Sequence, residues 1–253
     1  SSDLRTAAKK ETSTALVSHD FNKEMEDLRA RLTAPTGNKI KMDNKTFKLP
    51  SGDQLDSLDA VIVDFIYFNR YYEGAFDSNN IVPPNCFSLS PLPNGMTPSS
   101  NAPEAQHDNC AACAQNQFGS NGKGKACQNR ILMALLPSDA TSETPFMILD
   151  ISPLSALKGF NAYVQALMRS YNRPPYGVIT KIEFNEAVKW DVPVFGDPQL
   201  IEDVEFITMV RSRLQEAREL LMVEPDIAAI TAANEARPKA KRLIAPKKTA
   251  RRA

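Results

Sequence analysis

Four cysteines constrain this chain more than any other feature of its sequence. Cys86, Cys110, Cys113 and Cys127 lie in one segment, separated by 23, 2 and 13 residues. The two-residue spacing between Cys110 and Cys113 lets both thiolates bind one tetrahedral ion, and Cys127 follows at the loop length of a zinc finger. Cys86 then completes the shell across a longer loop. The spacing therefore predicts a structural zinc ion held by all four cysteines.

The segment that carries the cysteines needs such an anchor. Residues 69–129 are rich in glycine, proline and polar side chains, and a loop of this length without regular structure is unusual in a compact domain. Structural zinc contributes on the order of 10 kcal/mol to folding, because binding and folding are coupled. We therefore expect residues 69–129 to form a zinc-binding insertion.

Other interpretations of the cysteines stay open. Two disulfides would need an oxidising compartment, the Cys-x-x-Cys pair lacks the strand-then-helix signal of a redox pair, and four thiolates also bind iron–sulfur clusters. His107 either replaces one ligand or is an exposed loop residue. A catalytic zinc keeps an open position beside a carboxylate base, whereas four cysteines close the shell. With two distant histidines and no paired-acid metal motif, we expect a protein that is not an enzyme.

Hydrophobic periodicity divides the rest of the chain into short elements. Alternation predicts a hairpin at 39–49, a long apolar strand at 60–67, strands at 130–136 and 146–151, and a second hairpin at 177–184 and 187–195. Helical spacing predicts helices at 19–32, 152–171, 198–223 and 226–234. We therefore expect a flexible N-terminus at 1–18, a core domain at 19–223, and a short helix with a basic tail at 224–253.

The order of these elements matches a known architecture. A single helix between the third and fourth strands of a five-stranded barrel is the connectivity of the OB-fold, which binds nucleic acids and oligosaccharides. Other α+β sandwiches share this order. The fold predicted is α+β, an OB-fold-like five-stranded β-barrel with a zinc-binding loop insertion and flanking helices.

The charges are unevenly distributed, although basic and acidic residues both total 30. Eight basic residues and no acidic residue lie in 237–253, so 22 basic residues stand against 30 acidic ones in 1–236. The tail's Ala, Lys and Pro composition predicts a disordered arm that contacts phosphates, or else a solubilising terminus. The longest apolar run, at 61–68, is too short for a membrane span, and residues 1–6 lack the apolar core of a signal peptide.

Basic and aromatic side chains indicate nucleic acid as the ligand. The polar face of the first hairpin is mostly lysine, and the glycine-rich stretch after the Cys-x-x-Cys pair adds further basic residues and a phenylalanine. Such surfaces neutralise phosphates and stack bases without reading sequence. The alternative is that the aromatic rings pack in the core or over the metal, and Trp190 is expected in the core. The predicted contacts are Lys39, Lys41, Lys45, Lys48, Phe65, Tyr67, Tyr71, Tyr72, Phe118, Lys123, Lys125 and Arg130.

Short motifs between residues 61 and 167 carry a resemblance to a known family. They are Val63-Asp64-Phe65, Asn69-Arg70-Tyr71-Tyr72, Pro83-Pro84-Asn85-Cys86-Phe87, Cys110-Ala111-Ala112-Cys113, Asn116-Gln117-Phe118-Gly119-Ser120 and Gly124-Lys125-Ala126-Cys127-Gln128-Asn129. In these motifs the chain resembles a tailed-bacteriophage single-stranded-DNA-binding protein family with a four-cysteine zinc insertion. The resemblance implies a zinc-stabilised, OB-like replication or recombination protein in the host bacterial cytoplasm. The basic tail departs from the acidic tail with which such proteins recruit partners.

The leading hypothesis is a protein that binds single-stranded DNA without sequence preference, carries structural Zn²⁺, and acts with replication or recombination proteins away from membranes. The alternative is a zinc-stabilised protein-interaction adaptor of a phage assembly or host-takeover complex, since the acidic excess in 1–236 repels DNA unless charge is segregated. A DNA-cleaving nuclease is the third hypothesis.

Overall fold

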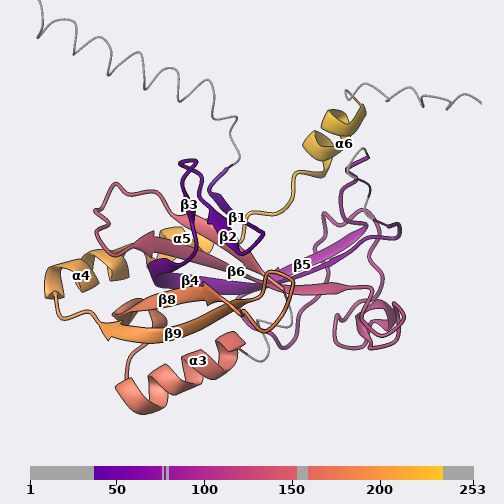
Figure 1. Cartoon of the computed structure of the whole chain (residues 1–253). Coiled ribbons are helices and arrows are strands. Elements are labelled where there is room, and N and C mark those ends of the chain that lie inside the picture. The colour runs from indigo at the N-terminus through magenta and orange to yellow at the C-terminus, as the bar shows by residue number, and fades with distance from the viewer. Residues whose placement is uncertain (1–36, 76, 78–79, 153–158, 236–253) are drawn as a thin grey trace, which may run out of the picture.

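The computed structural model describes residues 37–75, 77, 80–152 and 159–235 (Figure 1). The predicted flexible N-terminus at 1–18, the helix at 19–32 and the basic tail at 237–253 lie outside these residues. The strands are β1 (Lys39–Asp43), β2 (Thr46–Lys48), β3 (Gln54–Leu55), β4 (Leu58–Tyr71), β5 (Cys86–Ser90), β6 (Gln128–Pro137), β7 (Met147–Ile151), β8 (Val178–Phe184) and β9 (Pro193–Leu200). The helices are α3 (Asn161–Ala166), α4 (Val204–Ser212), α5 (Leu214–Leu221) and α6 (Ile227–Glu235).

In the described part of the chain, nine strands form one sheet of order β3-β2-β1-β7-β6-β4-β8-β9, with β5 added beside β4. All strand pairs are antiparallel except β1 with β7. The sequence predicts five strands, which is fewer than this sheet contains. Strand β4 is 14 residues long, so it pairs with β8 near its start and with β5 near its end while β6 follows most of its length.

The sheet is curled, so that strands far apart in its order meet. Phe47 of β2 stacks on Phe184 of β8 with ring centroids 4.2 Å apart. The Lys45 ammonium, in the β1–β2 turn, donates hydrogen bonds to the carbonyls of Asn185 and Trp190, both at 2.8 Å. The curled sheet is therefore an open half-barrel. The contacts between β2 and β8 that close it come from side chains, because the described strands β2 and β8 are not paired by backbone hydrogen bonds.

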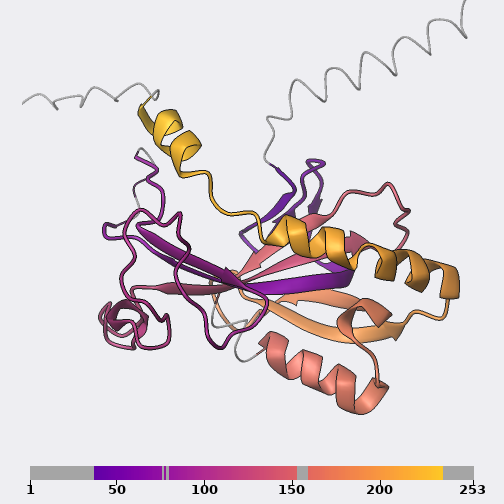
Figure 2. The ribbon, with the colours of Figure 1, turned by 180° about the vertical axis from the view of Figure 1, so that it is seen from behind.

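Both faces of the curled sheet are buried, because apolar side chains point to each side of its central strands. Inside the curl, Ile131, Met133 and Leu135 of β6 pack under α3 and the π-helical turn that follows it at Leu167–Tyr171. On the outer face, Leu132, Ala134 and Leu136 pack against α4 and α5. Figure 2 shows α5 lying across this outer face, with α3 on the opposite side of the sheet.

The sheet and α6 confirm most of the predicted elements, namely the first hairpin, the strands near 60–67, 130–136, 146–151 and 177–184, and the helix near 226–234. The last strand was placed too early: β9 begins at Pro193, and residues 185–192 form a loop. The helix predicted from 198 starts at Val204, because Asp203 is the N-cap and accepts hydrogen bonds from the amides of Glu205 and Phe206. Part of the helix predicted at 152–171 lies outside the described residues.

Two further predictions concern the insertion at 69–129 and the position of Trp190. The insertion at 69–129 contains the end of β4, all of β5, the start of β6 and one 3-10 turn, and its other described residues lie outside helices and strands, as the loop-rich composition predicts. Trp190, expected in the core, is 62% exposed in the loop before β9. In the described residues, no helix combines the length and the apolar character that crossing a membrane would require.

Candidate functional site

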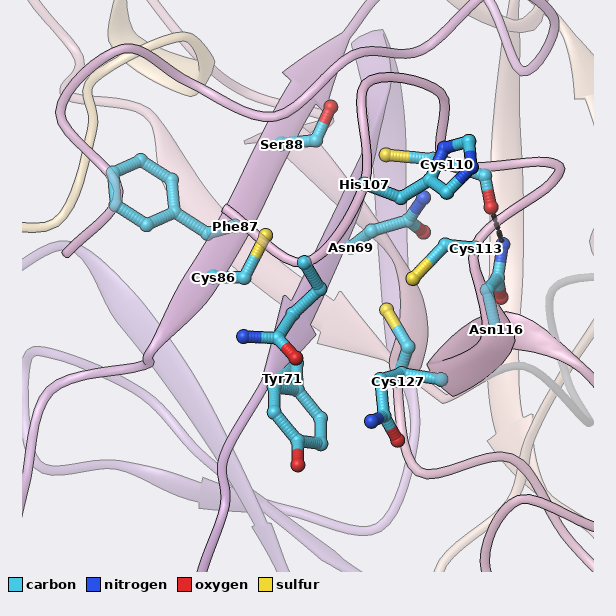
Figure 3. A pocket seen from close by; sticks show the side chains of 12 residues that line it. Asn69, Tyr71, Cys86, Phe87, Ser88, His107, Cys110, Cys113, Asn116 and Cys127 are labelled. Carbon is cyan, nitrogen blue, oxygen red and sulfur yellow. Dashed lines mark hydrogen bonds between the residues drawn. The ribbon is translucent and has the colours of Figure 1, made fainter. Parts of the chain in front are cut away.

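The four cysteines meet around one small cavity at the end of the sheet. Cys86 begins β5, Cys127 directly precedes β6, and Cys110 and Cys113 precede a 3-10 turn at Ala114–Asn116. All four line a cavity of about 20 Å³. Figure 3 shows the sulfurs of Cys110, Cys113 and Cys127 turned toward the same space, with Cys86 facing them from β5. The structure thus brings together the four residues that the spacing grouped.

Backbone and amide hydrogen bonds hold the loops that carry these cysteines. The Cys127 amide donates to the Gln115 carbonyl at 2.8 Å, and the Cys110 amide donates to the Met96 carbonyl at 3.0 Å. The Asn116 side-chain amide donates to the Cys110 carbonyl at 2.7 Å. These bonds position the thiols from three separate stretches of chain.

Burial favours the protonated form of the Cys86 and Cys127 thiols when no ion is bound. The pKa of Cys127 is raised to about 12, first by burial and then by the neighbouring thiols. The pKa of Cys86 is also raised, mainly by burial. Gathering several thiolate charges at one place is unfavourable unless a cation compensates them. The donor set therefore suits a soft divalent ion, which thiolates bind after losing their protons.

The cysteines do not, however, form a closed coordination shell. Across the described ranges no three His, Cys, Asp or Glu side chains are arranged as a group that could hold a metal ion. His107 lines the same cavity, but its ring is exposed and its Nδ1 accepts a hydrogen bond from the Asn109 amide at 3.0 Å. A metal ion at this place would require the sulfurs to move closer together.

A groove of about 630 Å³ lies on the outer face of the sheet, beyond the part that α5 covers. We call it the outer groove. By the alternation of β4, Phe68 and Arg70 share this face, and Tyr72, directly after the strand, lines the same groove. The Arg70 guanidinium lies 5.8 Å from the centroids of both rings, and its Nε donates to the Gln128 side chain at 3.0 Å. The groove is lined by Gly37, Asn38, Lys39, Phe68, Arg70, Tyr72, Ile81, Val82, Pro84, Leu89, Leu132, Ile148, Leu220, Leu221, Val223, Glu224, Pro225, Asp226 and Ile230.

A second, smaller cavity of about 240 Å³ lies between β4, β6 and the cysteine insertion. Three predicted contacts, Tyr67, Lys125 and Arg130, line it together with several asparagines. The Lys125 ammonium is 3.2 Å from the side-chain oxygens of Asn116 and Asn129. Burial raises the pKa of Tyr67, so its hydroxyl stays protonated and can donate a hydrogen bond. Arg130 is paired with Asp150 of β7.

The remaining predicted contacts are dispersed. Phe118 is 78% exposed, with the Lys125 ammonium 5.2 Å from its ring centroid. Phe65 packs edge-on against Phe160 in the inner core, with ring centroids 4.9 Å apart. Tyr71 lines the cysteine cavity. Lys39, Lys41 and Lys123 are exposed, Lys48 is paired with Asp43, and Lys45 is bound by the carbonyls of residues 185 and 190.

Sequence reasoning missed Arg70, the central side chain of the outer groove. The predicted strand at 60–67 ends before Arg70; continuing its alternation would have placed Phe68, Arg70 and Tyr72 on one face. It also missed the exposure of Trp190, which no local pattern indicates.

Comparisons with protein-family models, with curated proteins and with solved structures found no match for this chain. The function has therefore to be inferred from the chemistry of these surfaces.

Proposed function

We propose that this chain binds single-stranded DNA without sequence preference and that the DNA lies along the outer groove. The observation that carries the proposal is the side chain of Arg70, set between the rings of Phe68 and Tyr72 in a groove that Lys39 also lines. Basic groups that neutralise phosphates beside rings that stack bases are the common means of sequence-tolerant binding.

The connectivity supports an OB-fold-like interpretation of the half-barrel. Strands β4, β6 and β7 form an antiparallel meander, α3 follows, and then come β8 and β9, with β8 antiparallel to β4. OB-folds bind oligonucleotides on the face of their second and third strands and in the loops before the second and fifth. In this chain the matching strands are β6 and β7, whose outer face borders the groove through Leu132 and Ile148.

The acidic side chains at the groove are already engaged. Glu224 accepts hydrogen bonds from the side chains of Ser99 and Asn101, both at 2.6 Å. Asp226 accepts one from the Ala229 amide at 2.8 Å, at the start of α6. These contacts hold residues 224–226, which line the groove together with the exposed Lys39. Hydrogen bonds from neutral donors leave both carboxylates charged, and the Asp150 carboxylate lies 3.9 Å from the Arg70 guanidinium. We therefore propose that the phosphate chain lies beside β1 and β4, where Lys39 and Arg70 line the groove.

We further propose that Cys86, Cys110, Cys113 and Cys127 bind a structural zinc ion as thiolates. The proposal is supported by their convergence on one cavity at which three stretches of the insertion meet. Bound zinc would hold the insertion against the end of β4, next to Arg70 and Tyr72. The ion's role would be architectural, and the DNA contacts would come from the chain's own side chains.

The binding experiment is a fluorescence-anisotropy titration of labelled oligo-dT at two salt concentrations, with a matched duplex as control. We expect affinity to fall steeply with salt, because counterion release dominates such binding. Each lost phosphate contact should reduce the slope of log K against log[salt] by about 0.7. The double variant Lys39→Gln/Arg70→Gln should therefore bind more weakly and with a smaller slope.

The matched control is Lys181→Gln. Lys181 of β8 is paired with Glu183 and lines neither the outer groove nor the smaller cavity. It should bind like the wild-type chain. Binding that is absent at low salt, or that does not respond to salt, contradicts the proposal.

A second candidate function is the protein-interaction adaptor, and a specific feature of the outer groove favours it. Ile81, Val82 and Val223 line the groove and are 40%, 44% and 68% exposed. Exposed apolar side chains gathered at one groove are typical of protein-binding surfaces. The adaptor is favoured if the chain binds no DNA, if the wild-type chain binds a partner protein directly when both are purified, and if Ile81→Asp abolishes that binding.

A further inference from the structure

The loop between β8 and β9 exposes the only tryptophan of the chain. Trp190 is 62% exposed, and its neighbour Lys189 is exposed as well. Among the described residues no aromatic ring is paired with the indole. An indole is one of the largest apolar groups in proteins, and leaving it in water forgoes the stabilisation that burial would supply.

The loop that carries Trp190 is held in place, so the exposure is a property of a defined conformation. The Asn185 amide donates to the Val192 carbonyl at 2.8 Å and closes the loop at its base. The Asn185 side-chain oxygen accepts a hydrogen bond from the Ala187 amide at 2.9 Å and shapes the following turn. Both strands that flank the loop belong to the sheet.

The β1–β2 turn clamps the same loop from the other side. Asn44 and Lys45 have positive φ angles of 52° and 58°, as the two central residues of a tight hairpin turn require. The Lys45 ammonium then donates to the carbonyl of Trp190 itself, and the Lys45 amide donates to the Asp191 carboxylate at 2.8 Å. Because the backbone on both sides of the ring is already fixed, binding a flat partner has to order the side chain of Trp190 but not its loop.

We propose that Trp190 is a base-stacking residue of a second contact area for single-stranded DNA, separate from the outer groove. This inference rests on the proposed function. A nucleobase is the partner that fits, because stacking uses the open face of an indole and requires no pocket. Lys189, next in the chain, supplies a cation for the adjoining phosphate. In the OB-like order of strands this is the loop between the fourth and fifth strands.

The single tryptophan makes the test specific to one residue. Intrinsic fluorescence at tryptophan-selective excitation is followed while unlabelled oligo-dT is added, and binding is measured independently by anisotropy of a labelled oligonucleotide. Stacking should quench the emission in step with binding. Trp190→Ala should weaken binding about 5- to 150-fold, the equivalent of roughly 1–3 kcal/mol per stacked base. Trp190→Phe should restore most of the affinity.

The matched control is Val204→Ala, which shortens another exposed apolar side chain, 74% exposed at the start of α4. It should leave both affinity and fluorescence quenching unchanged. If anisotropy shows binding while the emission does not change and Trp190→Ala binds like the wild-type chain, the inference is overturned and the proposed function stands. If anisotropy shows no binding at all, the proposed function fails, and this inference fails with it.

Discussion

Replacing Phe47 by alanine tests whether the half-barrel is closed by side chains. Phe47 is fully buried, and its ring stacks on Phe184 across the opening between β2 and β8. The substitution removes the ring and leaves in place the hydrogen bonds that Lys45 donates to the β8–β9 loop. It should therefore destabilise the fold and loosen the loop that carries Trp190.

The expected loss is about 3–5 kcal/mol of unfolding free energy, because a buried phenylalanine loses its transfer free energy and leaves a cavity. Part of this loss of unfolding free energy comes from the interaction between the rings of Phe47 and Phe184. A double-mutant cycle with Phe184→Ala should give a coupling of about 0.5–1.5 kcal/mol, the usual value for aromatic pairs beyond their buried area. The total is a large fraction of a typical domain stability of about 5–15 kcal/mol.

The assay is urea unfolding followed by far-UV circular dichroism, with linear extrapolation to water. Tryptophan emission in the absence of urea reports separately on the β8–β9 loop. The matched control is Phe118→Ala, which removes an exposed ring and should cost within about 0.5 kcal/mol. A loss below about 1 kcal/mol for Phe47→Ala, with an unchanged urea dependence, would refute the idea that this stack closes the half-barrel.

Three further predictions concern the insertion and the helical layer. Removing zinc with a chelator, or replacing Cys127 by serine, should make residues 69–129 sensitive to protease while the sheet's circular dichroism persists; purified protein without bound zinc would contradict this. Asp64→Ala should cost about 1.5–3 kcal/mol in urea unfolding, because Asp64 accepts two charge-assisted hydrogen bonds from Arg218 of α5, at 2.8 and 3.2 Å. Arg213 lowers the pKa of Glu216, so this pair stabilises the fold above the ordinary pKa of a glutamate and the contribution is lost as pH falls through the lowered value. Glu216→Gln should therefore reduce the loss of stability on acidification, by at most about 1 kcal/mol for so exposed a carboxylate, and an unchanged pH profile would argue against the pair.

Local patterns were enough to place most of the strands. Alternation along 39–49 and 130–136 depends on side chains a few positions apart, and the structure has strands at both places. Cysteine spacing likewise grouped four residues that the structure gathers at one cavity. Errors arose where a local pattern is ambiguous: the apolar residues of 187–195 predict one strand, although residues 187–192 belong to a loop.

The sequence by itself determined the α+β class and the position of most elements, because these depend on neighbours in the chain, and the spacing of the four cysteines predicted that they would lie together. Only the tertiary structure decided that the β1–β2 turn meets the β8–β9 loop, since Lys45 and Asn185 are 140 positions apart. It also decided that Arg70 faces a groove walled by residues 220–226 and that Trp190 faces water. Contacts between such distant residues follow from how the whole sheet curls, and no local periodicity encodes that curvature.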